Sequence, residues 1–208
     1  MTPESLRRAL AAGALAFAAL WGAPLQAQEA ACLQCHEALT KGKVVHAAVA
    51  GGCATCHAAI DAAVVPHKLT GKIAKGLAAE PPALCYACHE EKGFQGKVTH
   101  GPVAAGMCTT CHNPHASDQA GLLTKAPSLM CLDCHTEVKK RPHILIAFSG
   151  NGHPLGDEKR PRPVADPMRP GKGFSCVTCH EPHRSDFARL TRFDGKAGMG
   201  LCQKCHQK

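Results

Sequence analysis

All fourteen cysteines of this 208-residue chain fall into one repeated pattern, and this pattern constrains the fold more than any other feature. Each pair of cysteines is separated by two residues and is followed at once by a histidine. The seven C-x-x-C-H motifs lie at residues 32–36, 53–57, 85–89, 108–112, 131–135, 176–180 and 202–206. Disulfide frameworks and zinc sites account poorly for the pattern, because neither needs a histidine at the same place every time.

The motif is typical of covalent haem attachment. Two thiols at this spacing reach the two vinyl groups of one porphyrin, and the adjacent histidine binds the iron. We predict attachment through Cys32, Cys35, Cys53, Cys56, Cys85, Cys88, Cys108, Cys111, Cys131, Cys134, Cys176, Cys179, Cys202 and Cys205. The predicted motif ligands are His36, His57, His89, His112, His135, His180 and His206. The sequence therefore predicts seven covalent haem c groups.

The number of remaining histidines equals the number of irons that need a second axial ligand. These seven non-motif histidines are His46, His67, His100, His115, His143, His153 and His183. Methionine can also bind haem iron. However, Met107, Met130 and Met199 lie within three residues of a motif cysteine, from where the far face of the iron is hard to reach. We therefore expect bis-histidine ligation at most or all haems.

Two short tethers join motif histidines to non-motif histidines. His115 follows His112 by three residues, with Pro114 between them, and His183 follows His180 in the same way. Because proline disfavours helix at the preceding residue, we expect an extended tether whose two histidines ligate different irons. Three residues span at most ~10 Å, so the two irons would lie within about 20 Å of each other.

The composition leaves little material for an ordinary hydrophobic core. Aromatic residues make up 4% of the chain, and both Phe17 and the single Trp21 lie near the N-terminus. We expect a mostly irregular fold with short α-helices and little or no β-sheet, in which stacked haems form the core. The chain without haem should then be largely unfolded, as in other domains that depend on a bound group.

The first 27 residues resemble an export signal. Arg7 and Arg8 precede an unbroken apolar run over 9–22, and Ala27 is a small residue suited to cleavage. The apolar run is short for a membrane span, which needs about 20 residues. We expect cleavage after Ala27 and a periplasmic protein; an uncleaved membrane anchor is the alternative.

Residues 28–208 form the predicted haem-binding domain, which contains an internal repeat. A Gly-Lys-Val-x-His segment recurs at Gly42–His46 and at 96–100, each between two motifs. Repeat units are predicted at about 32–84, 85–130 and 131–208, the third being distorted by an insertion.

Local composition favours short helices over 39–50, 58–65 and 70–79, where alanine and lysine are frequent. Residues 154–173 are rich in proline and basic residues and are predicted to form a loop. This loop is either a solvated insertion or a docking segment for a redox partner.

The doubled motifs carry a resemblance to a known family. In residues 108–115 and 176–183, a C-x-x-C-H motif runs directly into a Pro-His pair. The chain resembles multihaem c-type cytochromes with doubled CxxCH motifs, and specifically the seven-haem, cytochrome c3/c7-like electron carriers, over about residues 32–206. The resemblance implies electron transfer in anaerobic respiration.

The resemblance also implies an order of ligation. A non-motif histidine that precedes a motif would serve that haem, and one that follows a motif would serve the next haem. With haems numbered by motif, the second ligands of haems 1 to 7 would be His143, His46, His67, His100, His115, His153 and His183, in that order.

Two classes of function fit these features. The first is an electron carrier without a substrate of its own. It would exchange electrons with a quinol-oxidising membrane complex, other cytochromes, a terminal reductase or an outer-membrane conduit, and would allow haem–haem contacts between copies. The second is a reductase or oxidase of a small molecule at one open iron, for which haem 1 is the candidate because His143 is its weakest ligand. A filament unit or a fixed subunit of a membrane complex is chemically equivalent to the carrier.

The net charge of +8 does not indicate nucleic-acid binding here. Fourteen haem propionates would offset it, and many lysines and arginines are then expected to pair with propionates.

Overall fold

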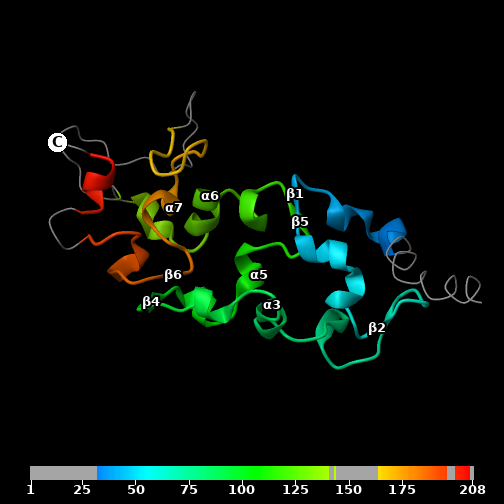
Figure 1. Ribbon diagram of the computed structural model, residues 1–208. Coiled ribbons are helices and arrows are strands. Elements are labelled where there is room, and N and C mark those ends of the chain that lie inside the picture. The colour runs from blue at the N-terminus through cyan, green and yellow to red at the C-terminus, as the bar shows by residue number, and fades with distance from the viewer. Residues whose placement is uncertain (1–31, 141–142, 144–163, 196–199, 207–208) are drawn as a thin grey trace, which may run out of the picture. The chain divides into compact units, whose positions relative to one another are not determined.

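The computed structural model describes residues 32–140, 143, 164–195 and 200–206 (Figure 1). The predicted export signal, His153 and the first half of the predicted 154–173 loop lie outside these residues. The chain divides into two compact units. Unit 1 comprises Met1–Lys41 and Ala47–Ala78, and unit 2 comprises Gly42–His46 and Ala79–Lys208.

In the residues that the structure describes, regular structure is confined to very short elements, as the sequence predicts. The α-helices are α3 (Ala83–Tyr86), α4 (Gly101–Ala104), α5 (Cys108–Cys111), α6 (Pro127–Leu132) and α7 (Cys176–Cys179). Short 3₁₀ turns lie at Glu37–Thr40, Ala47–Gly51, Cys53–Thr55, Ala74–Gly76, Glu91–Phe94, Ala120–Leu122, Thr136–Lys140, Ala188–Leu190 and Cys202–Lys204. The expectation of a mostly irregular fold with little β-sheet is confirmed.

Three antiparallel strand pairs connect these elements, and each strand has two residues. In unit 1, β2 (Ile60–Asp61) pairs with β3 (Lys68–Leu69). In unit 2, β1 (Val44–Val45) pairs with β5 (Ala116–Ser117), and β4 (Val98–Thr99) pairs with β6 (Arg184–Ser185).

The predicted helix over 39–50 is wrong. This segment instead contains β1, flanked by 3₁₀ turns. Its Gly42 lies against the chain at β5, where an added Cβ would come within 2.8 Å of the Ser117 backbone nitrogen. The backbone pairing with β5 therefore outweighs the helix preference of the alanines, which is a weak local bias.

The predicted helices over 58–65 and 70–79 are also wrong. The first segment contains β2, and the second contains only the 3₁₀ turn Ala74–Gly76. Gly76 has a φ of 63°, and a Cβ there would approach the Ala59 carbonyl oxygen to 2.8 Å. This close contact holds the second segment against the hairpin and prevents a continuous helix.

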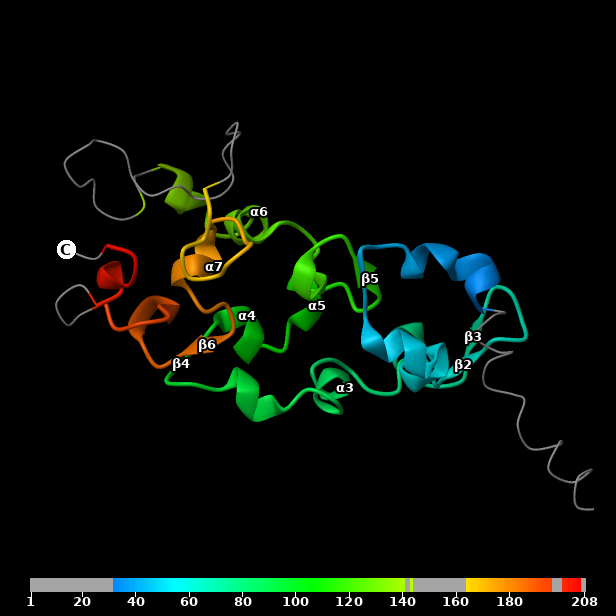
Figure 2. The ribbon, with the colours of Figure 1, turned by 45° about the horizontal axis from the view of Figure 1, so that its top comes forward.

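The two copies of the Gly-Lys-Val-x-His segment form equivalent pairings. The His46 N–H donates to the His115 carbonyl at 2.8 Å, and the His100 N–H donates to the His183 carbonyl at 3.0 Å. The pair β4 and β6 lies side by side in both ribbon views (Figure 2). Each copy therefore brings two non-motif histidines together at one end of a strand pair.

The described residues contain almost no apolar core of their own. Ala116 and Leu132, at 6% and 4% exposure, are the buried apolar side chains there. Six large apolar side chains are exposed within three residues of a motif cysteine or a predicted iron ligand: Leu39, Val45, Val65, Leu69, Met107 and Leu129. A porphyrin beside these histidines would cover such side chains, and its apolar surface would take the place of the missing core.

Candidate haem-binding sites

Each motif is held in a single helical turn. In six motifs, the backbone N–H of the histidine donates to the carbonyl of the first cysteine at 2.8–3.0 Å, namely at His57, His89, His112, His135, His180 and His206. One turn places residues three and four apart on the same face. The two thiols and the histidine therefore approach one ligand from the same side.

Five histidine rings of the motifs lie beside a ring of a non-motif histidine. The pairs and their centroid distances are His36–His67 at 5.9 Å, His46–His89 at 6.1 Å, His100–His135 at 6.1 Å, His112–His183 at 5.8 Å and His143–His180 at 6.0 Å. The angles between ring planes range from 10° to 41°. Every pair lies within one of the two compact units.

This spacing fits two axial ligands on opposite sides of one iron. A metal–nitrogen bond is about 2 Å long and the imidazole centre lies about 1 Å beyond the nitrogen, so the two centroids should be about 6 Å apart. Among the described residues, no group of three or more His, Cys, Asp or Glu side chains could hold a metal ion. Two imidazoles leave four in-plane positions, which is the number that a porphyrin supplies.

The ring pairs differ from the ligation order that the resemblance implies. That order assigned His46 to motif 2 and His100 to motif 4, but their rings lie beside His89 and His135. The rings of His67, His143 and His183 lie beside His36, His180 and His112, and not beside motifs 3, 1 and 7. The ring neighbours therefore favour a different order from the implied one for these five histidines.

The strand pairings account for this difference. Because β4 pairs with β6, His183 is carried back along the chain to the motif histidine His112. His180, three residues before His183, has its ring beside His143 instead. The two histidines of this Pro-containing tether therefore have different ring neighbours, which is compatible with the prediction that they ligate different irons.

Three motif histidines have an orientation that would leave Nε2 available to a metal. The Nδ1 atoms of His57, His112 and His180 lie 2.8 Å from the carbonyl oxygens of Lys75, Gly121 and Arg189, respectively. When Nδ1 donates its proton to a carbonyl, the Nε2 lone pair is available to a metal.

Sequence reasoning missed these carbonyl partners. Each lies on a residue with a positive φ of 58–69°. Gly121 and Arg189 fall in a recurring Ser-Asp-x-Ala-x-Leu segment, at 117–122 and 185–190, and this repeat is the signal that could have identified them.

The candidate second ligands His46 and His67 are held in a similar way. The Nδ1 of His46 lies 2.9 Å from the Pro114 carbonyl oxygen, and the Nδ1 of His67 lies 2.8 Å from that of Val64. His115 directly precedes β5; its carbonyl accepts from the His46 N–H, and its own N–H donates to the Asn113 side chain. His206 is held by its motif turn.

Burial affects the charge of His183. Its imidazole packs edge-on against Phe94, with ring centroids 5.2 Å apart. Burial lowers the pKa of His183, and the neighbouring His112 lowers it further. Both effects favour the neutral imidazole, which is the form that binds metals.

Several motif thiols of unit 2 lie close to one another. A hydrogen bond with the Cys176 thiol raises the pKa of Cys131, and burial adds to this effect. Burial also raises the pKa of Cys111 and Cys179, with further contributions from Cys134 and Cys205, respectively. The cysteines of motif 5 therefore lie near those of motifs 4 and 6, and the cysteines of motif 7 lie near those of motif 6.

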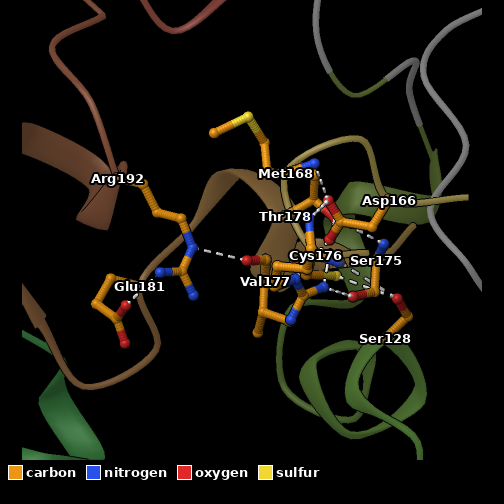
Figure 3. A network of polar contacts seen from close by, with 10 residues as sticks. Ser128, Asp166, Met168, Ser175, Cys176, Val177, Thr178, Glu181 and Arg192 are labelled. Carbon is orange, nitrogen blue, oxygen red and sulfur yellow. Dashed lines mark hydrogen bonds and ion pairs between the residues drawn. The ribbon is translucent and has the colours of Figure 1, made fainter. Parts of the chain in front are cut away.

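A buried polar network holds the segment before motif 6 against α7 (Figure 3). The Asp166 side chain is fully buried and accepts hydrogen bonds from the Thr178 hydroxyl at 2.7 Å and from Arg169 Nε at 2.5 Å. Ser175 and Thr178 form a capping box at the start of α7. Burial alone would raise the pKa of Asp166, but hydrogen bonds from Thr178, Arg169 and the Met168 N–H outweigh it and hold the pKa below its usual value.

Replacing Asp166 should destabilise the protein markedly. In Asp166→Ala, the Thr178 hydroxyl and Arg169 lose their buried acceptor, and we expect a loss of about 2–3 kcal/mol in the free energy of unfolding. Denaturant unfolding of the haem-loaded protein, followed by far-UV circular dichroism, measures this. The control is Glu90→Ala, because Glu90 forms an exposed ion pair with Lys92 and should contribute less than about 1 kcal/mol. Equal losses in the two variants would contradict the role of the network.

The same carboxylate should make stability dependent on pH in acid. Because the folded-state pKa is lowered, the contribution of Asp166 is complete above the unfolded value of about 3.9 and is lost as the pH falls through the folded-state pKa. Asp166→Ala should therefore be less sensitive to acid than the wild type in this range.

A family model for the doubled CXXCH motif matches the chain three times, over residues 46–94, 100–140 and 167–208. These matches cover more than half of the sequence and include both tethers. A comparison with curated proteins finds no match. Within the part of the chain that the structure describes, no helix has the length and apolar character needed to cross a membrane.

Proposed function

Because the chain belongs to the family defined by the doubled CXXCH motif, we propose that it is an electron-transfer protein that binds seven haem c groups. The family supports a multihaem c-type cytochrome with covalent haem c. The number seven comes from the seven motifs, and the role of a relay between redox partners comes from the ligand pairs.

One observation carries this proposal: the five ring pairs with centroids 5.8–6.1 Å apart. An iron with a histidine on each face has no open position for a substrate. Haem iron held in this way would supply one-electron exchange between its ferric and ferrous states, with a potential set by ligands, burial and hydrogen bonding.

The cysteines would attach the porphyrins without a change of oxidation state. Each thiol adds across one vinyl group, so that an S–H bond breaks, an S–C bond forms, and the hydrogen is transferred to the other vinyl carbon. The helical turn of each motif presents the two thiols on the same face.

The connections between ligand pairs support a central position for the haem of motif 4. The second ligand that the ring pairs suggest for it, His183, lies three residues from His180 and accepts a backbone hydrogen bond from His100. The Pro114 carbonyl, in the tether that follows His112, lies within hydrogen-bond distance of the His46 Nδ1 atom. We infer that electrons pass between the haem of motif 4 and those of motifs 3, 5 and 6, each within about 20 Å.

The enzyme alternative loses its main argument. Haem 1 was the candidate for an open site because His143 was its expected ligand. The His67 ring lies beside His36, and the His143 ring lies beside His180. His36 and His143 therefore each lie beside the ring of another histidine.

We place the protein in the periplasm, since residues 1–27 have the pattern of an export signal. Its partners would be other redox proteins, such as a quinol-oxidising membrane complex, another cytochrome, a terminal reductase or an outer-membrane conduit. Copies of the chain could also exchange electrons through adjacent haems.

The test is a count of haems together with a search for an open iron. The protein is produced with a haem-attachment system, and its intact mass and alkaline pyridine spectrum give the number of haems. We expect seven haems, low-spin signals in electron paramagnetic resonance, and no spectral shift when carbon monoxide is added to the reduced protein. A carbon monoxide adduct on about one haem in seven would instead favour the enzyme.

A further inference from the structure

Ser128 is a buried hydroxyl that connects two haem-attachment motifs. It lies on α6, three residues before the motif cysteine Cys131, and is 2% exposed. Its oxygen lies 3.4 Å from the backbone nitrogen and 3.6 Å from the sulfur of Cys176, the first cysteine of the next motif. Figure 3 shows the Ser128 side chain directed at Cys176 from the neighbouring helix.

The other polar groups at the start of α7 already have partners. The Ser175 N–H donates to the Thr178 hydroxyl at 3.1 Å, and that hydroxyl donates to Asp166. Arg169 donates to the Ser175 hydroxyl at 3.1 Å. Asp166 and Arg169 thus hold the capping residues, and Ser128 accepts the hydrogen bond of the Cys176 N–H.

Haem attachment determines the direction of the contact with the sulfur. A thioether sulfur has no hydrogen, so it can only accept. In the structure the Cys176 N–H and thiol both approach the Ser128 oxygen, and after attachment the contact with the sulfur is kept as a hydrogen bond only if the Ser128 hydroxyl donates to it.

We propose that Ser128 positions the attachment sulfur of Cys176 and raises the reduction potential of the haem bound there. This inference rests on the proposed function. A hydrogen bond to the sulfur withdraws electron density from the attached porphyrin, which favours the reduced iron. Hydrogen bonds to sulfur adjust the potentials of iron–sulfur sites for the same electrostatic reason.

The experiment is a redox titration of the haem-loaded Ser128→Ala variant, followed in the visible absorption band. One of the seven haem components of the titration curve should shift to a lower reduction potential, while the other six should keep their wild-type potentials. Ser128→Thr retains the hydroxyl and should restore the wild-type potential, even if the added methyl group lowers the thermal stability.

Ser185→Ala is the matched control. Ser185 is also buried, at 7% exposure, and its hydroxyl donates to the Thr191 carbonyl at 2.6 Å. This variant loses a buried serine hydroxyl in the same unit, and its component for the haem on Cys176 should remain at the wild-type potential. Peptide mass spectrometry of all variants verifies that haem is attached to Cys176 and Cys179.

The outcomes separate this inference from the proposed function. Haem on Cys176 in Ser128→Ala with an unchanged set of potentials would overturn the inference alone. A shift in Ser128→Ala that Ser128→Thr does not reverse would also overturn it, because the hydroxyl would then not be the cause. Absence of haem from Cys176 in the wild type would contradict the proposed function and this inference with it.

Discussion

Without its haems, the chain should lose nearly all of its ordered structure. Two buried apolar side chains, Ala116 and Leu132, cannot offset the conformational entropy of the described residues, which is about 1–2 kcal/mol for each ordered backbone residue. The strand pairs have two residues each and add little stability by themselves. The porphyrins must therefore supply the apolar surface around which the chain folds.

The measurement compares the chain made with and without haem attachment. Amide hydrogen exchange should show strong protection in the holoprotein and almost none in the apoprotein, and protease should cleave the apoprotein throughout. Adding free haem should not restore the fold, since the covalent attachment would be missing. An apoprotein with cooperative thermal unfolding would show that side-chain packing is sufficient.

Replacing His46 by alanine should open one specific iron, that of motif 3. The His46 ring lies 6.1 Å from the ring of His89, at 10° between planes. Its backbone hydrogen bond to His115 does not depend on the side chain, so the strand pairing should survive. We expect the reduced His46→Ala variant to bind carbon monoxide at about one haem in seven, whereas the wild type binds none.

Two further variants, each lacking one haem, identify the iron that His46→Ala opens. In a protein that lacks the motif 3 haem through Cys85→Ala and Cys88→Ala, His46→Ala should add no carbon monoxide site. In a protein that lacks the motif 2 haem through Cys53→Ala and Cys56→Ala, His46→Ala should still add one. The reverse result would support the ligation order implied by sequence and contradict the ring pairs.

The sequence is sufficient to predict the kind of fold and the residue types of the sites. The regular cysteine spacing indicates covalent attachment, and the scarcity of aromatic residues indicates a core not made of side chains. The repeat of Gly42–His46 at residues 96–100 corresponds to two equivalent strand pairings. These features follow from local spacing, which a single sequence contains.

The partners of the histidines could not be predicted in the same way. The pairing of His112 with His183 depends on β4 meeting β6, and two-residue strands leave no alternating pattern in the sequence. The same contacts explain the failed helix predictions. Gly42 and Gly76 pack closely against distant backbone, and this tertiary contact overrides the local preference.

The ring pairs also set a schedule for biosynthesis. Four of them join residues 31 to 43 positions apart, but His112 and His183 are separated by 71. Since a polypeptide is made from its N-terminus, His183 is synthesised after motifs 5 and 6, whereas both histidines of the motif 3 pair are present once residue 89 has been added. A chain that ends before residue 183 would therefore contain the whole motif 3 pair, but it would lack the second ligand that we propose for the haem of motif 4.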